Sequence, residues 1–186
     1  LTMLHDINSY VDHNKFLQAV EAAKTAIPNK FCIVEHLADV TEYDDSPDLT
    51  EIHPKDRDNI DFRICIFYPD KDNKIPRLKP VCDILESMQG VERAAIINIG
   101  PKSIMPKHID DMERPLYEET PFYNVFTGFH IPQGELGVKV GEDIIADVSK
   151  PIVFNAQIPH EAWNQTSQDW LSLLIYINND TFKKEQ

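Results

Sequence analysis

The sequence is poor in cysteine and has no long apolar run, and each shortage excludes a class of protein. Only three cysteines occur in 186 residues, Cys32, Cys65 and Cys82. An odd number of widely spaced cysteines beside apolar residues is typical of reduced core thiols, not of a disulfide framework or a zinc knuckle. No stretch approaches the ~18 to 20 apolar residues that a transmembrane helix needs. We therefore expect a protein of the cytoplasm with no membrane partner.

Basic residues are also too few for a nucleic-acid binder. The chain has 18 Lys and Arg against 31 Asp and Glu, which gives a formal charge of -13 and a pI near 4.8. Such a surface repels a phosphate backbone, and the sequence contains no basic patch that could offset the repulsion. We expect no nucleic-acid partner.

What the sequence does contain indicates one globular domain over residues 1–186. Hydrophobic residues make up 42% of the chain and aromatic residues 9%, which excludes disorder as its overall state. A chain of this length can bury one sizeable core.

The first half of the chain predicts two helices and a strand. Apolar residues at helical spacing from Phe16 to Ile27 predict a helix over about 12–26, which Pro28 ends. A similar pattern from Leu78 to Met88, stopped by Gly90, predicts a second helix. The other predicted segments are a short strand-like run over 31–34, an acidic loop over 41–59 and a strand over 62–68.

From Val91 onward the pattern changes to short apolar segments separated by Gly and Pro. This spacing favours an antiparallel sandwich or barrel over parallel βαβ units. We predict a mainly β protein of jelly-roll type with flanking helices, in which residues 1–90 support a core at 91–180. The predicted strands of this core span 94–99, 122–131, 136–140, 144–148, 151–154 and 171–177.

Three of the seven histidines stand out, His108, His130 and His160, and two of them, His108 and His160, are candidate metal ligands. His108 and Asp110 form a His-x-Asp pair, and in an extended segment residues two apart project to the same side. With His160 they would form a facial triad of two histidines and one carboxylate, which leaves three octahedral positions open and suits Fe(II). On spacing alone, His108 and His160 could equally be ordinary loop residues. The remaining histidines, His5, His13, His36 and His53, are expected to be ordinary polar residues.

The surroundings of these residues resemble the aspartyl/asparaginyl β-hydroxylase family of Fe(II)- and 2-oxoglutarate-dependent oxygenases, and less closely the bacterial proline hydroxylases. In that family a proline-bearing turn precedes the first metal His, a strand with a His follows, and a His-Glu-x-Trp-Asn box holds the last metal His. The matching segments here are 99–108, 128–132 and 159–164, and the box reads His-Glu-Ala-Trp-Asn. Order and spacing agree from 91 to 177, while the first 90 residues show no such match.

The resemblance implies a cupin-like double-stranded β-helix and a hydroxylase, a non-haem iron dioxygenase. His108, Asp110 and His160 would hold Fe(II), although animal members of the family have no carboxylate where Asp110 stands. The co-substrates would be 2-oxoglutarate, with His130 beside it, and O2. The substrate would be a small molecule, such as an amino acid, or a peptide or protein side chain. Glu161 and Trp163 would support the fold.

Two departures from the family concern the co-substrate pocket. The family's arginines, two residues before the strand His and ten residues after the last metal His, are here Gly128 and Trp170. Strand alternation places Gly128 on the face of His130, where a glycine would open space, and Trp170 on the face of Ser172. Burying a dicarboxylate without a cation is costly, so we expect weaker 2-oxoglutarate binding. The candidate replacement cations are Lys139, on a predicted strand, and Lys102, Lys107 and Arg114, near the metal loop.

A rival hypothesis is a non-catalytic or divergent cupin-like metal-binding module that has lost normal 2-oxoglutarate binding. The absence of both arginines favours this module. The presence of all three ligand types favours the enzyme, because a module without catalysis has no need for the His-x-Asp pair.

Overall fold

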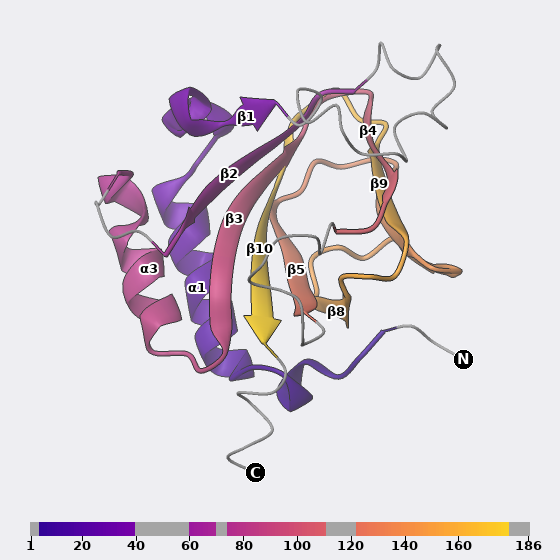
Figure 1. The fold of residues 1–186 in the computed structure, drawn as a ribbon. Helices are drawn as coiled ribbons and strands as arrows, with labels where there is room; N and C mark the ends of the chain where they lie inside the picture. Colours follow the sequence, from indigo (N-terminus) through magenta and orange to yellow (C-terminus); the bar gives the residue numbers. More distant parts are fainter. Residues whose placement is uncertain (1–3, 40–59, 70–73, 111–121, 179–186) are drawn as a thin grey trace.

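The computed structural model describes residues 4–39, 60–69, 74–110 and 122–178, and in these ranges two antiparallel sheets face each other. Helices cover the outer face of the larger sheet (Figure 1). The larger sheet consists, in order, of β1 (Ala38–Asp39), β2 (Phe62–Tyr68), β3 (Val91–Ile99), β10 (Trp170–Asn178), β5 (Phe122–His130) and β8 (Ile152–Asn155). The smaller sheet consists of β4 (Ser103–His108), β9 (His160–Asn164), β6 (Leu136–Val140) and β7 (Asp143–Ile145). This is the predicted jelly roll, a cupin-like double-stranded β-helix.

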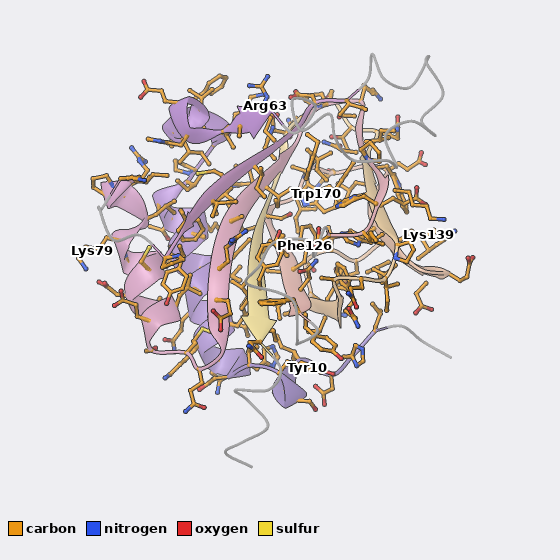
Figure 2. All side chains as sticks on the ribbon, in the orientation of Figure 1. Tyr10, Arg63, Lys79, Phe126, Lys139 and Trp170 are labelled. Carbon is orange, nitrogen blue, oxygen red and sulfur yellow. The ribbon has the colours of Figure 1, made fainter. Side chains whose placement is uncertain are left out.

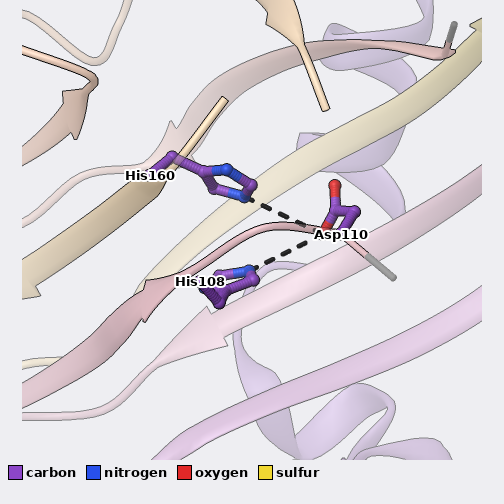
Figure 3. A group of neighbouring side chains, drawn as sticks. All are labelled: His108, Asp110 and His160. Carbon is purple, nitrogen blue, oxygen red and sulfur yellow. Dashed lines mark ion pairs between the residues drawn. The ribbon is translucent and has the colours of Figure 1, made fainter. Parts of the chain in front are cut away.

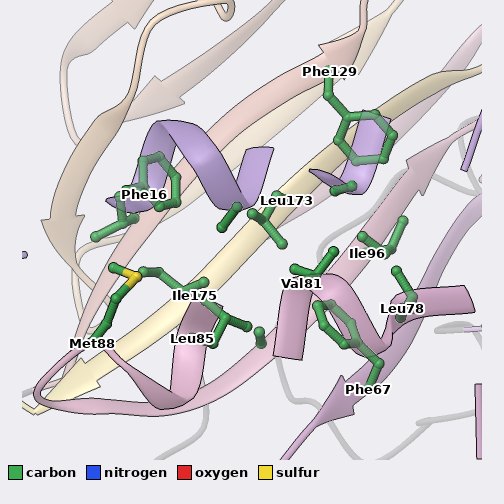
Figure 4. Packing of buried hydrophobic residues seen from close by; sticks show 14 of the residues in the cluster. Phe16, Phe67, Leu78, Val81, Leu85, Met88, Ile96, Phe129, Leu173 and Ile175 are labelled. Atoms are coloured by element: carbon green, nitrogen blue, oxygen red, sulfur yellow. The ribbon is translucent and has the colours of Figure 1, made fainter. Parts of the chain in front are cut away.

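Strand β10 shows how the larger sheet separates two apolar cores. Leu171, Leu173 and Ile175 pack with the helices, whereas Trp170 and Leu174 pack with residues of the smaller sheet. Because both faces are buried, β10 is apolar almost throughout. Figure 4 shows the helix-side core, where Phe16 of α1 (His13–Ala26) and Leu85 of α3 (Lys79–Glu86) lie against the sheet.

The two predicted helices are confirmed. The side chain of Asp12 accepts a hydrogen bond from the Lys15 N–H and caps α1, and the N–H of Ile27 closes its last turn on Ala23. Pro80 lies in the first turn of α3, where its missing N–H costs no helical bond. No helix of the described ranges is long and apolar enough to span a bilayer.

The strand expected over 31–34 is wrong. The chain there forms two 3₁₀ turns, η2 (Lys30–Cys32) and η3 (Val34–His36). The side chain of Asn29 accepts a hydrogen bond from the Phe31 N–H, which starts the first turn, and the Phe31 ring is 74% exposed. A local cap therefore overrides the apolar pattern.

The other strand predictions are confirmed, with β7 shorter than its expected range of 144–148. There the Asp147 side chain accepts a hydrogen bond from the Ser149 N–H and turns the chain. Strands β4 and β9 were not predicted. The acidic loop over 41–59 lies outside the described residues. The division at residue 90 stays a prediction, although β2 pairs with β3 across it.

No disulfide joins the three cysteines. Burial raises the pKa of the Cys65 thiol to about 11, so this thiol stays protonated and unreactive at neutral pH. Cys65 is thus a core thiol, whereas Cys32 and Cys82 are half-buried, and their reduced state stays a prediction.

Candidate metal centre

Pairing of β4 with β9 places His108 directly opposite His160. The register shifts between Met105 and His108, because three steps along β4 match two steps along β9. The extra residue makes a bulge that contains Pro106, where a residue without an N–H costs no ladder bond. The bulge sets which way His108 points. The two imidazole rings lie 4.3 Å apart between centroids.

Backbone carbonyls fix the tautomer of both histidines in the same way. Nδ1 of His108 lies 2.7 Å from the carbonyl oxygen of Pro106, and Nδ1 of His160 lies 2.8 Å from that of Ile158. A carbonyl oxygen can only accept, so each Nδ1 carries the proton and donates. The lone pair of each imidazole is therefore on Nε2, the atom that can bind a metal.

Asp110 lies where both Nε2 atoms point (Figure 3). Its Oδ1 is 3.6 Å from Nε2 of His108 and 3.8 Å from Nε2 of His160. Its Oδ2 accepts a hydrogen bond of 2.7 Å from the Asn124 amide, and its backbone N–H donates to Ala156. One oxygen of the carboxylate is thus hydrogen-bonded to Asn124, and the other faces the two histidines.

The surroundings favour a neutral imidazole beside an ionised carboxylate. Burial lowers the pKa of His160 to about 4, and His108 adds to this, while Asp110 and the bond to Ile158 oppose it. Burial alone would raise the pKa of Asp110, but the neighbouring His108 and His160 and the hydrogen bond from the Asn124 amide outweigh it, so that pKa is lowered. These are the protonation states that a metal requires of its ligands.

The three side chains fit a divalent metal ion. Their ligand atoms all lie within 4.8 Å of one another. Two ligands at about 2.1 Å from one metal stand about 3.0 to 3.4 Å apart, so a small closure from 3.6 and 3.8 Å completes the site. Two imidazoles and one carboxylate leave part of the coordination sphere open for substrate or O2.

Comparison with known proteins identifies the family. A family model described as aspartyl/asparaginyl beta-hydroxylase matches residues 32–179. The chain belongs to this family. The match begins well before residue 91, where the resemblance in the sequence motifs begins. A search of curated proteins found no match.

Solved structures of similar shape include oxygenases. A Pseudomonas putida prolyl-4-hydroxylase is 12% identical, with 86% of this chain and 85% of that chain covered and a TM-score of 0.49. An oxidoreductase of the 2OG-Fe(II) oxygenase family from Burkholderia pseudomallei is 14% identical, with 64% and 69% covered and a TM-score of 0.48. At these identities the likeness is one of fold alone.

His130, expected beside the co-substrate, points the other way. Leu171 lies opposite His130 and Ser172 opposite Gly128, so Phe129 is an extra residue and the alternation breaks there. The His130 ring turns to the helix side, where its Nε2 lies 2.8 Å from the carbonyl oxygen of Ile27. The expectation that Gly128 and His130 share a face is wrong, because a bulge intervenes.

The candidate cations do not reach the space between the sheets either. Lys139 alternates with the inward-facing Val138 and Val140, and its ammonium lies 3.5 Å from Glu142 on the outer face (Figure 2). Lys102 donates to the carbonyl of Gln165, and Lys107 is exposed. Arg114 lies outside the described residues. Lys139 thus lies away from the space where the co-substrate carboxylate was expected.

Trp170 and Ser172 do face the space between the sheets, as the alternation predicts. Both are buried, at 0% and 1% exposure. Gly128 does not open space beside them, contrary to expectation. A Cβ atom there would lie 2.6 Å from Ile131 Cγ1 and 2.9 Å from Trp170 Nε1, because the indole and Ile131 already fill the room.

Sequence reasoning missed three polar residues of this region. Asn124 orients Asp110, and its sequence signal is a lone amide in an apolar strand. Asn164, the last residue of the His-Glu-Ala-Trp-Asn box, is buried and binds the backbone at Ile99, Gly100 and Gln168, which ties β9 to the neighbouring loops. On the larger sheet, Tyr176 of β10 lies between Arg93 of β3 and Asn124 of β5. These three residues therefore form one row across the strands, at the end of the sheet nearest the candidate metal site.

Proposed function

We propose that this protein is an Fe(II)-dependent oxygenase that hydroxylates an amino acid or a side chain of a peptide or protein. The observation that carries the proposal is the arrangement of His108, Asp110 and His160. Two imidazoles with their lone pairs set by backbone carbonyls meet one ionised carboxylate, and a metal with three such ligands would have further positions for substrate or O2. Membership of the hydroxylase family supports the same activity.

In this proposal the metal ion supplies O2 activation, and the chain supplies ligands and orientation. His108 and His160 bind through Nε2, while their Nδ1–H groups stay on Pro106 and Ile158. Asn124 keeps Oδ2 of Asp110 occupied, so Oδ1 remains the ligand atom. Phe154, whose ring centroid lies 4.9 Å from that of His160, helps to exclude water from the inner side of the site.

The family's co-substrate 2-oxoglutarate fits this chain poorly. Trp170 stands where a charged partner for its tail carboxylate is expected, and no Lys or Arg of the described ranges is buried. Three cysteines without a disulfide and an oxidisable iron centre suit a reducing compartment, which supports the cytoplasm as the place of action.

The second candidate function is a cupin-like binding module without catalysis. The observation that favours it is the buried indole of Trp170, which removes a charge from the co-substrate end. A module would bind metal without consuming O2, so the two functions differ in a measurable way.

The test combines metal stoichiometry with oxygen uptake. We expect anaerobic titration with Fe(II) to give one ion per chain, and admission of O2 with a mixture of 2-oxo acids to give uptake above the rate of free Fe(II). The double variant His108→Ala, His160→Ala should bind no stoichiometric metal, whereas His130→Ala, a matched control on the opposite face of the sheet, should bind one. A double variant that retains the metal would refute the metal centre. Metal binding without O2 uptake would favour the module.

A further inference from the structure

Two buried hydrogen-bond donors at the start of β10, between the two sheets, have no partner among the described residues. We call this place the inner end of the barrel, and the place of His108, Asp110 and His160 the metal end. The two donors are Nε1 of Trp170 and Oγ of Ser172. Both side chains project from β10 towards the smaller sheet and are almost completely buried. Buried donors in folded proteins are nearly always paired, and leaving one unpaired costs free energy. Two such donors in one place therefore point to a ligand that accepts hydrogen bonds.

The two donors converge on one spot. Ser172 lies directly opposite Gly128 on β5, and Trp170 Nε1 lies within 2.9 Å of where a Gly128 Cβ would be. The indole N–H therefore lies over Gly128, beside the hydroxyl. Figure 2 shows Trp170 and Phe126 between the two sheets, and their rings meet edge to face at 5.8 Å.

The described neighbours of this spot on β3 are apolar and uncharged. Across β10, the neighbours on β3 are Ile99, opposite Trp170, and Ile97, opposite Ser172. The partly buried cation that faces this side of the larger sheet is Arg93, which lies at the metal end with Tyr176 and not with Trp170. A carboxylate placed at the inner end would lose its hydration and gain only neutral donors. An uncharged carbonyl can accept from both donors without that cost.

We infer that the inner end binds the uncharged tail of a 2-oxo acid, so that the co-substrate of this protein is not a dicarboxylate. The inference rests on the proposed function, since the metal at His108, Asp110 and His160 would hold the 2-oxo acid end of the same molecule. Trp170 then discriminates against 2-oxoglutarate by excluding a charge, and Ser172 adds the second hydrogen bond. Selection would then rest on the penalty for an unpaired charge as well as on the two hydrogen bonds that form.

A matched pair of ligands tests the inference. 2-Oxoglutarate and its 5-methyl ester share the metal-binding end and the chain length, and they differ in the charge of the tail. With Zn(II)-loaded protein, which is redox-inactive and diamagnetic, calorimetry should show the ester binding at least about tenfold more tightly. The chain has two tryptophans, so ¹H–¹⁵N spectra contain two indole N–H resonances. The resonance of Trp170, assigned with Trp170→Phe, should move downfield with the ester, and that of Trp163 should stay.

Variants separate the two donors from the rest of the chain. Trp170→Phe keeps an aromatic ring and loses the N–H, and Ser172→Ala loses only the hydroxyl. Each should weaken ester binding about tenfold, and Lys139→Ala on the outer face should not. Trp170→Arg should reverse the preference and tighten 2-oxoglutarate.

Several results would overturn the inference while leaving the metal centre intact. These are 2-oxoglutarate binding at least as tightly as the ester, no binding of either ligand to the Zn(II) form, or an ester preference that survives both Trp170→Phe and Ser172→Ala. Tight 2-oxoglutarate binding that Arg93→Met abolishes would place the tail carboxylate at the metal end instead. Failure to bind Zn(II) through the triad would refute the proposed function itself.

Discussion

His160 combines near-complete burial with a position between an imidazole and a carboxylate. Its neutral form is favoured, and its Nδ1–H is committed to the Ile158 carbonyl. A ligand prepared in this way binds metal at neutral pH with little competition from protons. The same burial has a consequence for the stability of the metal-free protein.

We predict that the metal-free protein loses stability as the pH falls from about 6.5 to about 4. The unfolded chain takes up a proton at His160 near its ordinary pKa of 6.5, whereas the folded chain resists until a pKa of about 4. Stability is therefore complete above 6.5 and declines below it, by at most about 3 kcal/mol. Urea unfolding in EDTA across this range measures it. His160→Gln should flatten the profile, and an unchanged profile in this variant would contradict the assignment.

Asn124 should matter to metal binding although it is not a ligand. Its amide holds Oδ2 of Asp110 at 2.7 Å, and loss of such supporting hydrogen bonds typically lowers metal affinity about 10- to 100-fold. We expect this loss in Asn124→Leu when Zn(II) binding is measured by competition with a chelating dye. Tyr123→Phe, which removes a polar group from the other face of the same strand, is the control and should bind normally. Equal affinities would mean that Asn124 does not position Asp110.

Strand β5 illustrates why part of the site could not be read from the sequence. Its apolar residues from Phe122 onward predict a strand, and they also predict that Gly128 and His130 share a face. The bulge at Phe129 places His130 on the opposite face from Gly128, and nothing in the residue pattern marks this bulge. In the same way, period-two alternation placed Lys139 on a strand but could not say which face is the outer one.

Strands β4 and β9 escaped prediction for a different reason. They carry Pro106, the two histidines of the candidate metal site and Asn164, residue types that interrupt an apolar alternation. That His108 and Asp110 lie together was predictable, because His-x-Asp in an extended segment brings two side chains to one side wherever the strand lies. The helices were predictable because a full helical turn of apolar spacing and a capping residue occur together.

The contact between β5 and β10 at Gly128 leads to a stability prediction. A Cβ atom at Gly128 would lie 2.6 Å from Ile131 Cγ1 and 2.9 Å from Trp170 Nε1. Gly128→Ala should therefore lower the free energy of unfolding by about 1 to 3 kcal/mol, measured with urea. In the Gly128→Ala, Ile131→Ala double variant one of the two close contacts is gone, so the two effects should be less than additive. A neutral single variant would show that the indole can move aside.

Across the whole molecule, the metal would join parts of the chain that are distant in sequence. His108 ends β4, Asp110 follows two residues later, and His160 begins β9, so an ion would fasten this edge of the smaller sheet. The chain also carries a formal charge of -13, and a divalent cation relieves a little of that self-repulsion. Both effects act on the folded state.

We accordingly predict that Zn(II) raises the melting temperature. An ion present at about 100 times its dissociation constant stabilises by about 2.7 kcal/mol, which for a chain of this size is a rise of roughly 5 to 10 °C. Calorimetric scans with Zn(II) and with EDTA measure the difference. His108→Ala, His160→Ala should melt at the same temperature in both, and a metal-dependent rise in that variant would mean that the ion binds elsewhere.

Anomalous diffraction at the iron absorption edge can show whether His108, Asp110 and His160 hold one metal ion. Crystals of the protein loaded anaerobically with Fe(II) should show one anomalous peak at about 2.0 to 2.3 Å from Nε2 of both histidines and Oδ1 of Asp110. An iron peak at any other place, or none at these residues in protein that contains one iron per chain, would contradict the account.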